Sequence, residues 1–131
     1  TYVAAKDTHY SAKNYRLHDE NGNQVIELDL EVNGATQHLR GEGNGPISAI
    51  LNALQFPIDV LTYEERSISS GAHAKALALI ELQVKGTGKS AFGAGVHDNI
   101  VTSSIEAIIA SVNRLIEQGV LSPEQVMAAA V

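Results

Sequence analysis

The clearest pattern in the sequence is a strict alternation of apolar and acidic residues. Residues 26–32 read Ile-Glu-Leu-Asp-Leu-Glu-Val, so apolar side chains share one face of an extended strand and acidic side chains share the other. Such alternation predicts a strand with one buried and one hydrated face. Asn21-Gly22 and Asn33-Gly34 flank it, and an Asn-Gly pair favours a tight hairpin. We therefore expect neighbouring strands at residues 14–18 and 36–40.

After the glycine-rich run at residues 41–45, the period of the apolar residues changes. They now fall at helical spacing, at Ile47, Ile50, Leu51 and Leu54. Pro46 suits the first turn of a helix, where its missing N–H costs nothing. The pattern predicts a helix that stops before Pro57.

The second half of the chain repeats this order. Strands are expected at residues 60–69, 76–85 and 90–96, and a longer helix follows with Gly119 at its C-terminal end. Each half then reads β-β-β-α, which predicts an α+β domain of two pseudo-symmetric units. We expect a linker at residues 1–13, one folded domain at residues 14–119 and a short tail helix at residues 120–131. The domain would consist of two repeats, at residues 14–56 and 60–119. The tail helix would begin at the capping-box pattern Ser122-Pro123-Glu124-Gln125.

Composition narrows the class of protein. The chain has 131 residues, 44% of them apolar, no cysteine and a formal net charge of −6. Thiol chemistry is thereby excluded, and the negative charge disfavours nucleic acid and anionic membranes as partners. Without a long apolar run or a basic leader, a cytoplasmic protein is expected. Because the chain begins at Thr1, we expect it to be a piece of a longer polypeptide.

Some apolar residues exceed what one small domain needs to bury. Leu77 and Leu79 lie on the strand face opposite to Ala78 and Ile80, and Ile109 lies off the main helical stripe. A homodimer would cover such a surplus. The alternative is cover by the tail helix or by an upstream domain.

The sequence offers little support for a catalytic site or a metal site. The histidines (His9, His18, His38, His73 and His97) are scattered, without H-x-H or H-x-x-x-H spacing. The acidic residues of the 26–32 strand are typical of a hydrated face, and no serine nucleophile motif is present. We expect no catalytic residue, no metal site and no cofactor in this chain.

The two glycine-rich segments that join a strand to a helix, at residues 41–47 and 93–100, are called the joints and allow three interpretations. Residues 41–45 could bind a phosphate, but the run lacks the lysine of a P-loop. The glycines could instead serve tight turns only. The third interpretation is a carboxylate site at a helix N-terminus, where backbone N–H groups attract an anion. Small residues are crowded at 67–76, where they leave room for either a closely packed backbone or a ligand.

The motifs resemble a known family. The run Gly41-Glu42-Gly43-Asn44-Gly45-Pro46-Ile47, then Tyr63, the stretch from Ser70 to Ala76, and the run from Gly93 to Ser104 are similar to the C-terminal regulatory domain of 2-isopropylmalate synthase. Citramalate synthase shares this domain. The resemblance implies a dimer that binds the pathway end product, L-leucine, and inhibits a catalytic barrel elsewhere in the chain. That barrel would be a divalent-metal-dependent acyltransferase, which condenses acetyl-CoA with 2-oxoisovalerate.

The resemblance also implies the residues of the effector pocket. Carried over by motif position, they are Gly43, Gly45, Ile47, Ser48, Val60, Tyr63, Ser67, Ala74, Ala76, His97, Asp98, Asn99 and Ile100. The ammonium group of the effector would be bound by backbone carbonyl groups of the joint or by Asp98. The chain departs from the usual family pattern at Thr62 and His73, beside this pocket. Two alternatives remain open: an isoleucine sensor from citramalate synthase, and a dimerisation domain without effector.

Overall fold

The computed structural model describes residues 10–32, 34–55, 57–70 and 73–119, apart from the side chains of residues 69–70 and 73–74. Strands β1 (Tyr10–Glu20), β2 (Asn23–Val32) and β3 (Ala35–Gly43) precede helix α1 (Pro46–Leu54). Strands β4 (Ile58–Ser70), β5 (His73–Val84) and β6 (Ser90–His97) precede helix α2 (Ile100–Glu117). The predicted α+β class with two β-β-β-α units is confirmed.

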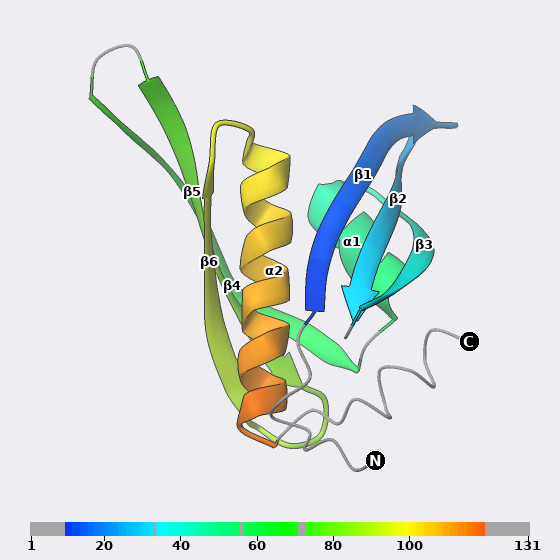
Figure 1. The fold of residues 1–131 in the computed structure, drawn as a ribbon, viewed down its shortest axis with the longest axis vertical. Helices are drawn as coiled ribbons and strands as arrows, with labels where there is room; N and C mark the ends of the chain where they lie inside the picture. Colours follow the sequence, from blue (N-terminus) through cyan, green and yellow to red (C-terminus); the bar gives the residue numbers. More distant parts are fainter. Residues whose placement is uncertain (1–9, 33, 56, 71–72, 120–131) are drawn as a thin grey trace.

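Each unit forms its own antiparallel sheet, in the order β1-β2-β3 and β4-β5-β6. Helix α1 packs on β2 and β3, whereas α2 packs on β5 and β6 and also contacts β1. In Figure 1, α2 lies between the second sheet and β1, so the longer helix joins the two units. A helix therefore covers one face of each sheet, and neither described helix packs on the other face, which is called the open face below.

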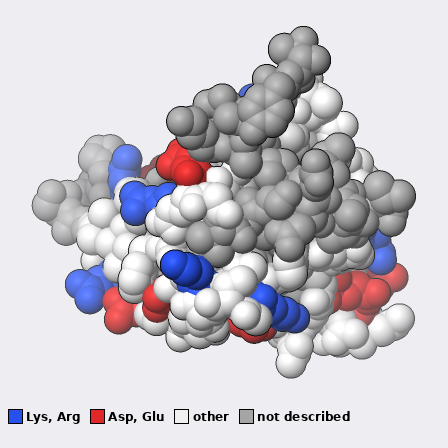
Figure 2. All heavy atoms as spheres, turned by 90° about the horizontal axis from the view of Figure 1, so that it is seen from below, with Lys and Arg blue, Asp and Glu red and all other residues white. Residues whose placement is uncertain are grey.

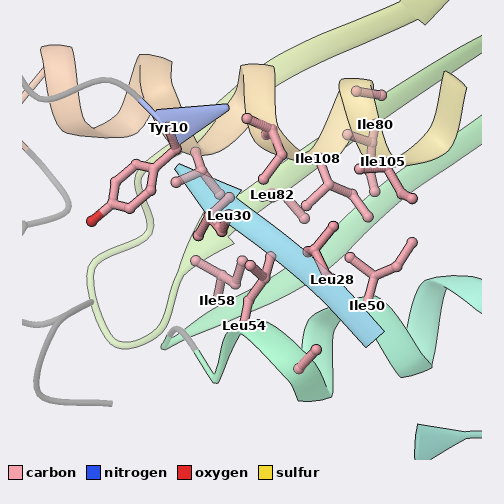
Figure 3. Close-up of a cluster of buried hydrophobic side chains, with 14 of the residues drawn as sticks. Tyr10, Leu28, Leu30, Ile50, Leu54, Ile58, Ile80, Leu82, Ile105 and Ile108 are labelled. Atoms are coloured by element: carbon pink, nitrogen blue, oxygen red, sulfur yellow. The ribbon is translucent and has the colours of Figure 1, made fainter. Parts of the chain in front are cut away.

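A single hydrophobic core connects the two units. The even-numbered side of β2 is buried as predicted, with Leu28 and Leu30 at 1% exposure or less. Figure 3 shows these leucines between Leu54 of the α1 region and Ile108 of α2, with Ile80 and Leu82 of β5 close by. Because both sheets and both helices contribute to this cluster, neither unit has a core of its own.

The glycines of the two joints have a packing role that the sequence did not predict. Gly41 and Gly43 belong to β3, and Gly93 and Gly95 belong to β6, so these residues extend strands and do not form loops. A Cβ atom on Gly41 would collide with the backbone of Ala49 and Ala53 in α1. A Cβ atom on Gly93 would collide with the backbone of α2. The glycines therefore allow each helix to lie directly against its third strand.

The pseudo-symmetry extends to irregular features. β1 carries a register shift between Ala12 and Asn14, and β4 carries one between Val60 and Thr62. The tyrosine that follows pairs with a buried aliphatic residue of the central strand in both units: Tyr15 with Leu28, and Tyr63 with Ile80. Since a β-bulge re-aims nearby side chains, the two tyrosines are placed by the same device.

The first strand begins earlier than predicted. β1 starts at Tyr10 rather than at residue 14, and the Tyr10 side chain is buried. Asn113 of α2 accepts a hydrogen bond from the Tyr10 N–H (2.8 Å) and donates one to its carbonyl (3.0 Å). A side chain 103 positions away thus extends the strand, which local sequence cannot reveal. The predicted tail helix at 120–131 lies outside the described residues.

Candidate functional site

Two adjoining cavities lie where the helices begin. The first, the helix-start cavity, has a volume of about 230 Å³. Its lining residues come from both joints and from β4: Gly45, Pro46, Ile47, Ser48, Tyr63, Glu65, Ile100, Val101 and Ser104. The second, the hairpin cavity, has a volume of about 360 Å³ and is lined by Glu65, Arg66, Ser67, Lys75, Ala76, Asp98 and Ile100. Glu65 and Ile100 line both, so the two cavities are neighbours.

The first turn of α1 is open toward the helix-start cavity. Its N-cap residue is Gly45, and no side chain caps the helix within the described part of the chain. The N–H groups of Ile47 and Ser48 therefore have no partner inside the helix. A Cβ built on Gly45 would meet no described atom within 4 Å, so there is room beside this N-cap residue. Such a helix end attracts an anion.

Helix α2 begins differently. Asn99 is its N-cap, and the Asn99 Oδ1 atom accepts hydrogen bonds from Val101 N (2.8 Å) and Thr102 N (3.3 Å). The chain's own side chain thus satisfies the first turn of α2, as is usual for an asparagine cap. Among the described residues, α1 thus begins without a side-chain cap, whereas α2 begins with one.

A polar group of three side chains closes the opposite wall. The Tyr63 hydroxyl donates a hydrogen bond to Glu65 and lies 2.8 Å from Ser104 Oγ. Burial raises the pKa of Tyr63 to about 12, and the hydrogen bond to Glu65 acts in the same direction. At neutral pH Tyr63 is therefore protonated, and the Glu65 carboxylate is the negative group of this cavity.

The lining of the helix-start cavity is otherwise apolar. Pro46, Ile47, Ile100 and Val101 come from the first turns of the two helices. The cavity thus combines uncapped N–H groups, a carboxylate and an apolar wall within a volume below the ~300–1,000 Å³ of drug-sized sites. Those features suit a small zwitterion with an aliphatic side chain.

The structure brings together many of the residues predicted for the pocket. Gly45, Ile47, Ser48, Tyr63 and Ile100 line the helix-start cavity. Ser67, Ala76 and Asp98 line the hairpin cavity, where Ile100 also lies.

Other predicted residues line neither cavity. A Cβ atom on Gly43 would lie against Ser48, and Val60 packs against the core. His97 accepts a hydrogen bond from the Asn99 N–H through Nδ1 (3.0 Å), while Asn99 itself caps α2. The side chain of Ala74 lies outside the described residues.

Sequence reasoning missed four residues of the helix-start cavity: Pro46, Glu65, Val101 and Ser104. The sequence did contain a signal for Glu65. Side chains alternate along a strand, so residue 65 shares a face with the predicted site residues 63 and 67. The same alternation puts Thr62 on the opposite face, where its hydroxyl donates to Glu81 (3.2 Å). Thr62, expected beside the pocket, therefore faces away from it.

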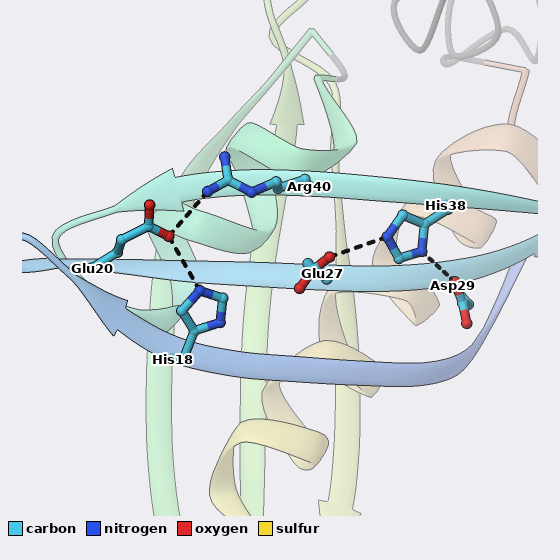
Figure 4. Close-up of polar contacts among 6 residues, drawn as sticks. All are labelled: His18, Glu20, Glu27, Asp29, His38 and Arg40. Carbon is cyan, nitrogen blue, oxygen red and sulfur yellow. Dashed lines mark hydrogen bonds and ion pairs between the residues drawn. The ribbon is translucent and has the colours of Figure 1, made fainter.

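The remaining polar clusters do not form a metal site. Among the described residues, no group of three or more His, Asp or Glu side chains could hold a metal ion. On the open face of the first sheet, His38 Nδ1 lies 2.7 Å from Asp29 Oδ1 and Nε2 lies 3.4 Å from Glu27 Oε1 (Figure 4). The hydrogen bond to Asp29, followed by that to Glu27, raises the pKa of His38.

On the face drawn in Figure 2, the Lys and Arg side chains of the described residues lie interspersed with Asp and Glu side chains. Within the described residues, neither helix is long and apolar enough to cross a membrane.

Comparison with known proteins supports the resemblance noted above. The family model described as the LeuA allosteric (dimerisation) domain matches residues 1–116. The chain is 38% identical over 112 residues to a 2-isopropylmalate synthase of Pseudomonas syringae pv. tomato, covering 86% of this chain and 20% of that protein. It is 44% identical over 109 residues to the 2-isopropylmalate synthase of an Azoarcus species, covering 83% of this chain and 19% of that protein.

The 2-isopropylmalate synthase of Azotobacter vinelandii shows 36% identity over 112 residues. The chain spans only about a fifth of the length of these relatives. The matched family model, by contrast, covers both β-β-β-α units nearly to the end of α2. This chain belongs to the family of LeuA allosteric (dimerisation) domains.

Proposed function

We propose that this domain is an L-leucine sensor and that leucine binds in the helix-start cavity. The observation that carries the proposal is the placement of opposite recognition groups around one small apolar space. Uncapped N–H groups of α1 face the cavity from one side, and the Glu65 carboxylate faces it from the other. A free amino acid carries the matching pair of charges on one carbon atom.

Each part of leucine then has a partner. The carboxylate accepts hydrogen bonds from the N–H groups of Ile47 and Ser48, with the helix dipole adding attraction. The ammonium group pairs with Glu65, and Tyr63 orients that carboxylate through its hydrogen bond. The isobutyl group contacts the apolar first turns, at Ile47 and Ile100. Glu65 replaces Asp98 as the preferred ammonium partner, because Asp98 lines only the hairpin cavity.

The domain is further proposed to act within a longer protein. Relatives of which it spans about a fifth are named 2-isopropylmalate synthase. We infer that the parent is a divalent-metal-dependent acyltransferase that condenses acetyl-CoA with 2-oxoisovalerate. Leucine bound to this domain would lower that activity as feedback inhibition.

The first experiment is calorimetric titration of the 131-residue protein with L-leucine, L-isoleucine and L-valine. Saturable binding of leucine near one per protomer, tighter than that of isoleucine, is expected. Tighter binding of isoleucine would instead identify a citramalate synthase sensor. No heat with any of the three would leave a dimerisation domain and contradict the proposal.

Variants test the assigned contacts. Ser48→Trp fills the cavity and should abolish leucine binding without unfolding the domain. Glu65→Gln should weaken leucine binding by about 10–100-fold, because a hydrogen-bonded charge is worth about 1.5–3 kcal/mol. Glu64→Gln is the matched control, since Glu64 precedes Glu65 but faces the other side of β4.

A ligand without the ammonium group separates the two halves of the site. 4-Methylpentanoate keeps the carboxylate and the isobutyl group of leucine. Its affinity should not fall in Glu65→Gln and should rise if anything, because this ligand has no ammonium group to lose a partner and its carboxylate is repelled by that of Glu65. An equal loss of leucine and 4-methylpentanoate binding in this variant would contradict the role of Glu65 as the ammonium partner.

A further inference from the structure

Strand β1 of the first unit is attached to helix α2 of the second unit at two points. At the start of the helix, the Tyr15 hydroxyl lies 2.7 Å from Thr102 Oγ1. Toward its end, the Asn113 side chain accepts a hydrogen bond from the Tyr10 N–H (2.8 Å) and donates one to the Tyr10 carbonyl (3.0 Å). We call these contacts the Tyr15 tie and the Tyr10 tie. Figure 1 shows β1 running beside α2.

The two ties fit the geometry of a strand that lies along a helix. Thr102 and Asn113 are eleven positions apart in sequence. That spacing is about three helical turns, so the two residues lie on one face of α2, and it rises about 16 Å. Tyr10 and Tyr15 are five positions apart, which also spans about 16 Å of strand. β1 therefore runs antiparallel to α2 and is held at both ends of this stretch.

A β-bulge allows β1 to make both ties. Side chains alternate along a regular strand, so positions 10 and 15 would lie on opposite faces. The register shift in β1 changes this parity, because Tyr10 lies opposite Val32 and Tyr15 lies opposite Leu28. All four residues belong to the core or pack against it. The bulge therefore turns both tyrosines toward the side of the sheet that faces α2.

The Tyr15 tie adjoins the helix-start cavity. Thr102 lies in the first turn of α2, and its neighbours Ile100, Val101 and Ser104 line that cavity. A ligand that contacts these neighbours restrains the same helix end that holds Tyr15. Backbone hydrogen bonds make α2 a stiff element between the two ties, so a restraint at its start is felt along β1.

We propose that α2 transmits effector binding to the start of β1, an inference that rests on the proposed binding of leucine in the helix-start cavity. As an edge strand, β1 opens locally from α2 for a small fraction of the time. Leucine binds better to the closed state, in which the first turn of α2 is ordered, and therefore lowers the open fraction. Since β1 begins at Tyr10, the restraint reaches the point where the preceding chain enters this strand.

Hydrogen exchange of the 131-residue protein, followed by NMR with and without saturating L-leucine, tests this coupling. Leucine should slow exchange of the Tyr10 N–H at least about fivefold, the lower end of usual allosteric coupling. Residues 17–20 of β1 lie beyond both ties and should change less. Equal slowing at Tyr10 and at residues 17–20 would overturn the proposal, because leucine would then act only on overall stability. Unchanged exchange at Tyr10 in the presence of bound leucine would overturn it as well.

Tyr15→Phe and Thr102→Val each remove one hydroxyl group of the Tyr15 tie. Either variant should bind leucine as tightly as the unmodified protein, because the open state of β1 remains a minor one. Leucine should no longer slow exchange at Tyr10 more than at residues 17–20. Thr62→Val is the matched control, since it removes a hydroxyl group that faces away from the cavity, and it should retain the slowing. Retained slowing in both tie variants would overturn the role of the tie.

Calorimetry with L-leucine on the same samples separates this proposal from that of leucine binding. If leucine binds without slowing exchange at Tyr10, then the coupling is overturned and the leucine sensor stands. If no leucine binds, then the proposed function is overturned and the coupling with it. Thermal unfolding followed by circular dichroism checks each variant, and either tie variant decides the question if the other fails to fold.

Discussion

The hydroxyl group of Tyr63 on β4 lies 2.8 Å from Ser104 Oγ on α2. Its counterpart in the first unit, Tyr15, lies 2.7 Å from Thr102 Oγ1 on the same helix. Both tyrosines therefore contact the first turns of α2, although they belong to different units. Of these two tyrosines, Tyr63 lines the helix-start cavity and Tyr15 does not. Substitution of Tyr15 is therefore a matched control for substitution of Tyr63.

Tyr63→Phe should weaken leucine binding several-fold, because Glu65 loses the hydrogen bond that orients it. Tyr15→Phe should leave leucine affinity unchanged. Each variant should lose about 0.5–1.5 kcal/mol of unfolding free energy, the typical worth of a hydrogen bond. Calorimetry with L-leucine and urea unfolding measure the two effects. Equal leucine affinities in the two variants would rule out an orienting role for Tyr63.

Gly93→Ala should destabilise the domain by about 1–3 kcal/mol or more, as overpacking does. The added Cβ atom would collide with the backbone of Ala107 and Ser111, and α2 would have to move away from β6. Ala94→Ser, on the exposed side of the same strand, is the control and should change stability little. Urea unfolding compares the two. A Gly93→Ala variant as stable as the unmodified protein would show that α2 moves freely on the sheet.

Asn113→Ala should destabilise the protein by about 1–3 kcal/mol. The substitution removes the two buried hydrogen bonds between the Asn113 side chain and the Tyr10 backbone, and one such bond is worth about 0.5–1.5 kcal/mol. The neighbouring Arg114 is exposed, so Arg114→Ala serves as the control. Hydrogen exchange should show faster exchange at Tyr10 in Asn113→Ala alone. Unchanged protection of Tyr10 would contradict the assignment.

The imidazole of His38 should titrate above its usual pKa of 6.5, because it lies between the carboxylates of Asp29 and Glu27. A raised pKa in the folded state means that the contribution of His38 to stability is fully present below the unfolded pKa. It is lost as the pH rises through the folded pKa. NMR titration of the His38 ring in the unmodified protein measures the folded value.

Asp29→Asn should lower the pKa of His38, since Asp29 is its main partner. Glu31→Gln removes an equal charge from the same face of β2 but contacts Lys13 instead, and should have a smaller effect. If both variants shift the His38 pKa equally, then the general charge of the sheet is responsible and not the hydrogen bond.

Local pattern accounted for the elements of the fold. The alternation at 26–32, the Asn-Gly turns and the helical spacing from Ile47 to Leu54 predicted the order of strands and helices in the first unit, and the repeat of this order in the second half of the chain predicted the second unit. The side-chain periods of strands and helices are fixed by backbone geometry, so these signals persist without tertiary information. The apolar outward positions Leu77 and Leu79 were visible for the same reason. The motifs also identified the family.

The site needed the tertiary structure, because its parts come from strands and helix ends far apart in sequence. The sequence pointed to both helix starts as N–H donors, but in the described part of the chain Asn99 caps α2 and no side chain caps α1. Glu65 became a candidate only when Tyr63, Ser104 and the start of α1 were seen around one cavity. The tertiary structure also determines which glycines are needed for close packing of a helix against a strand. Gly41 and Gly93 are required by the approach of helix backbones, and such distances between elements are not encoded in any local pattern.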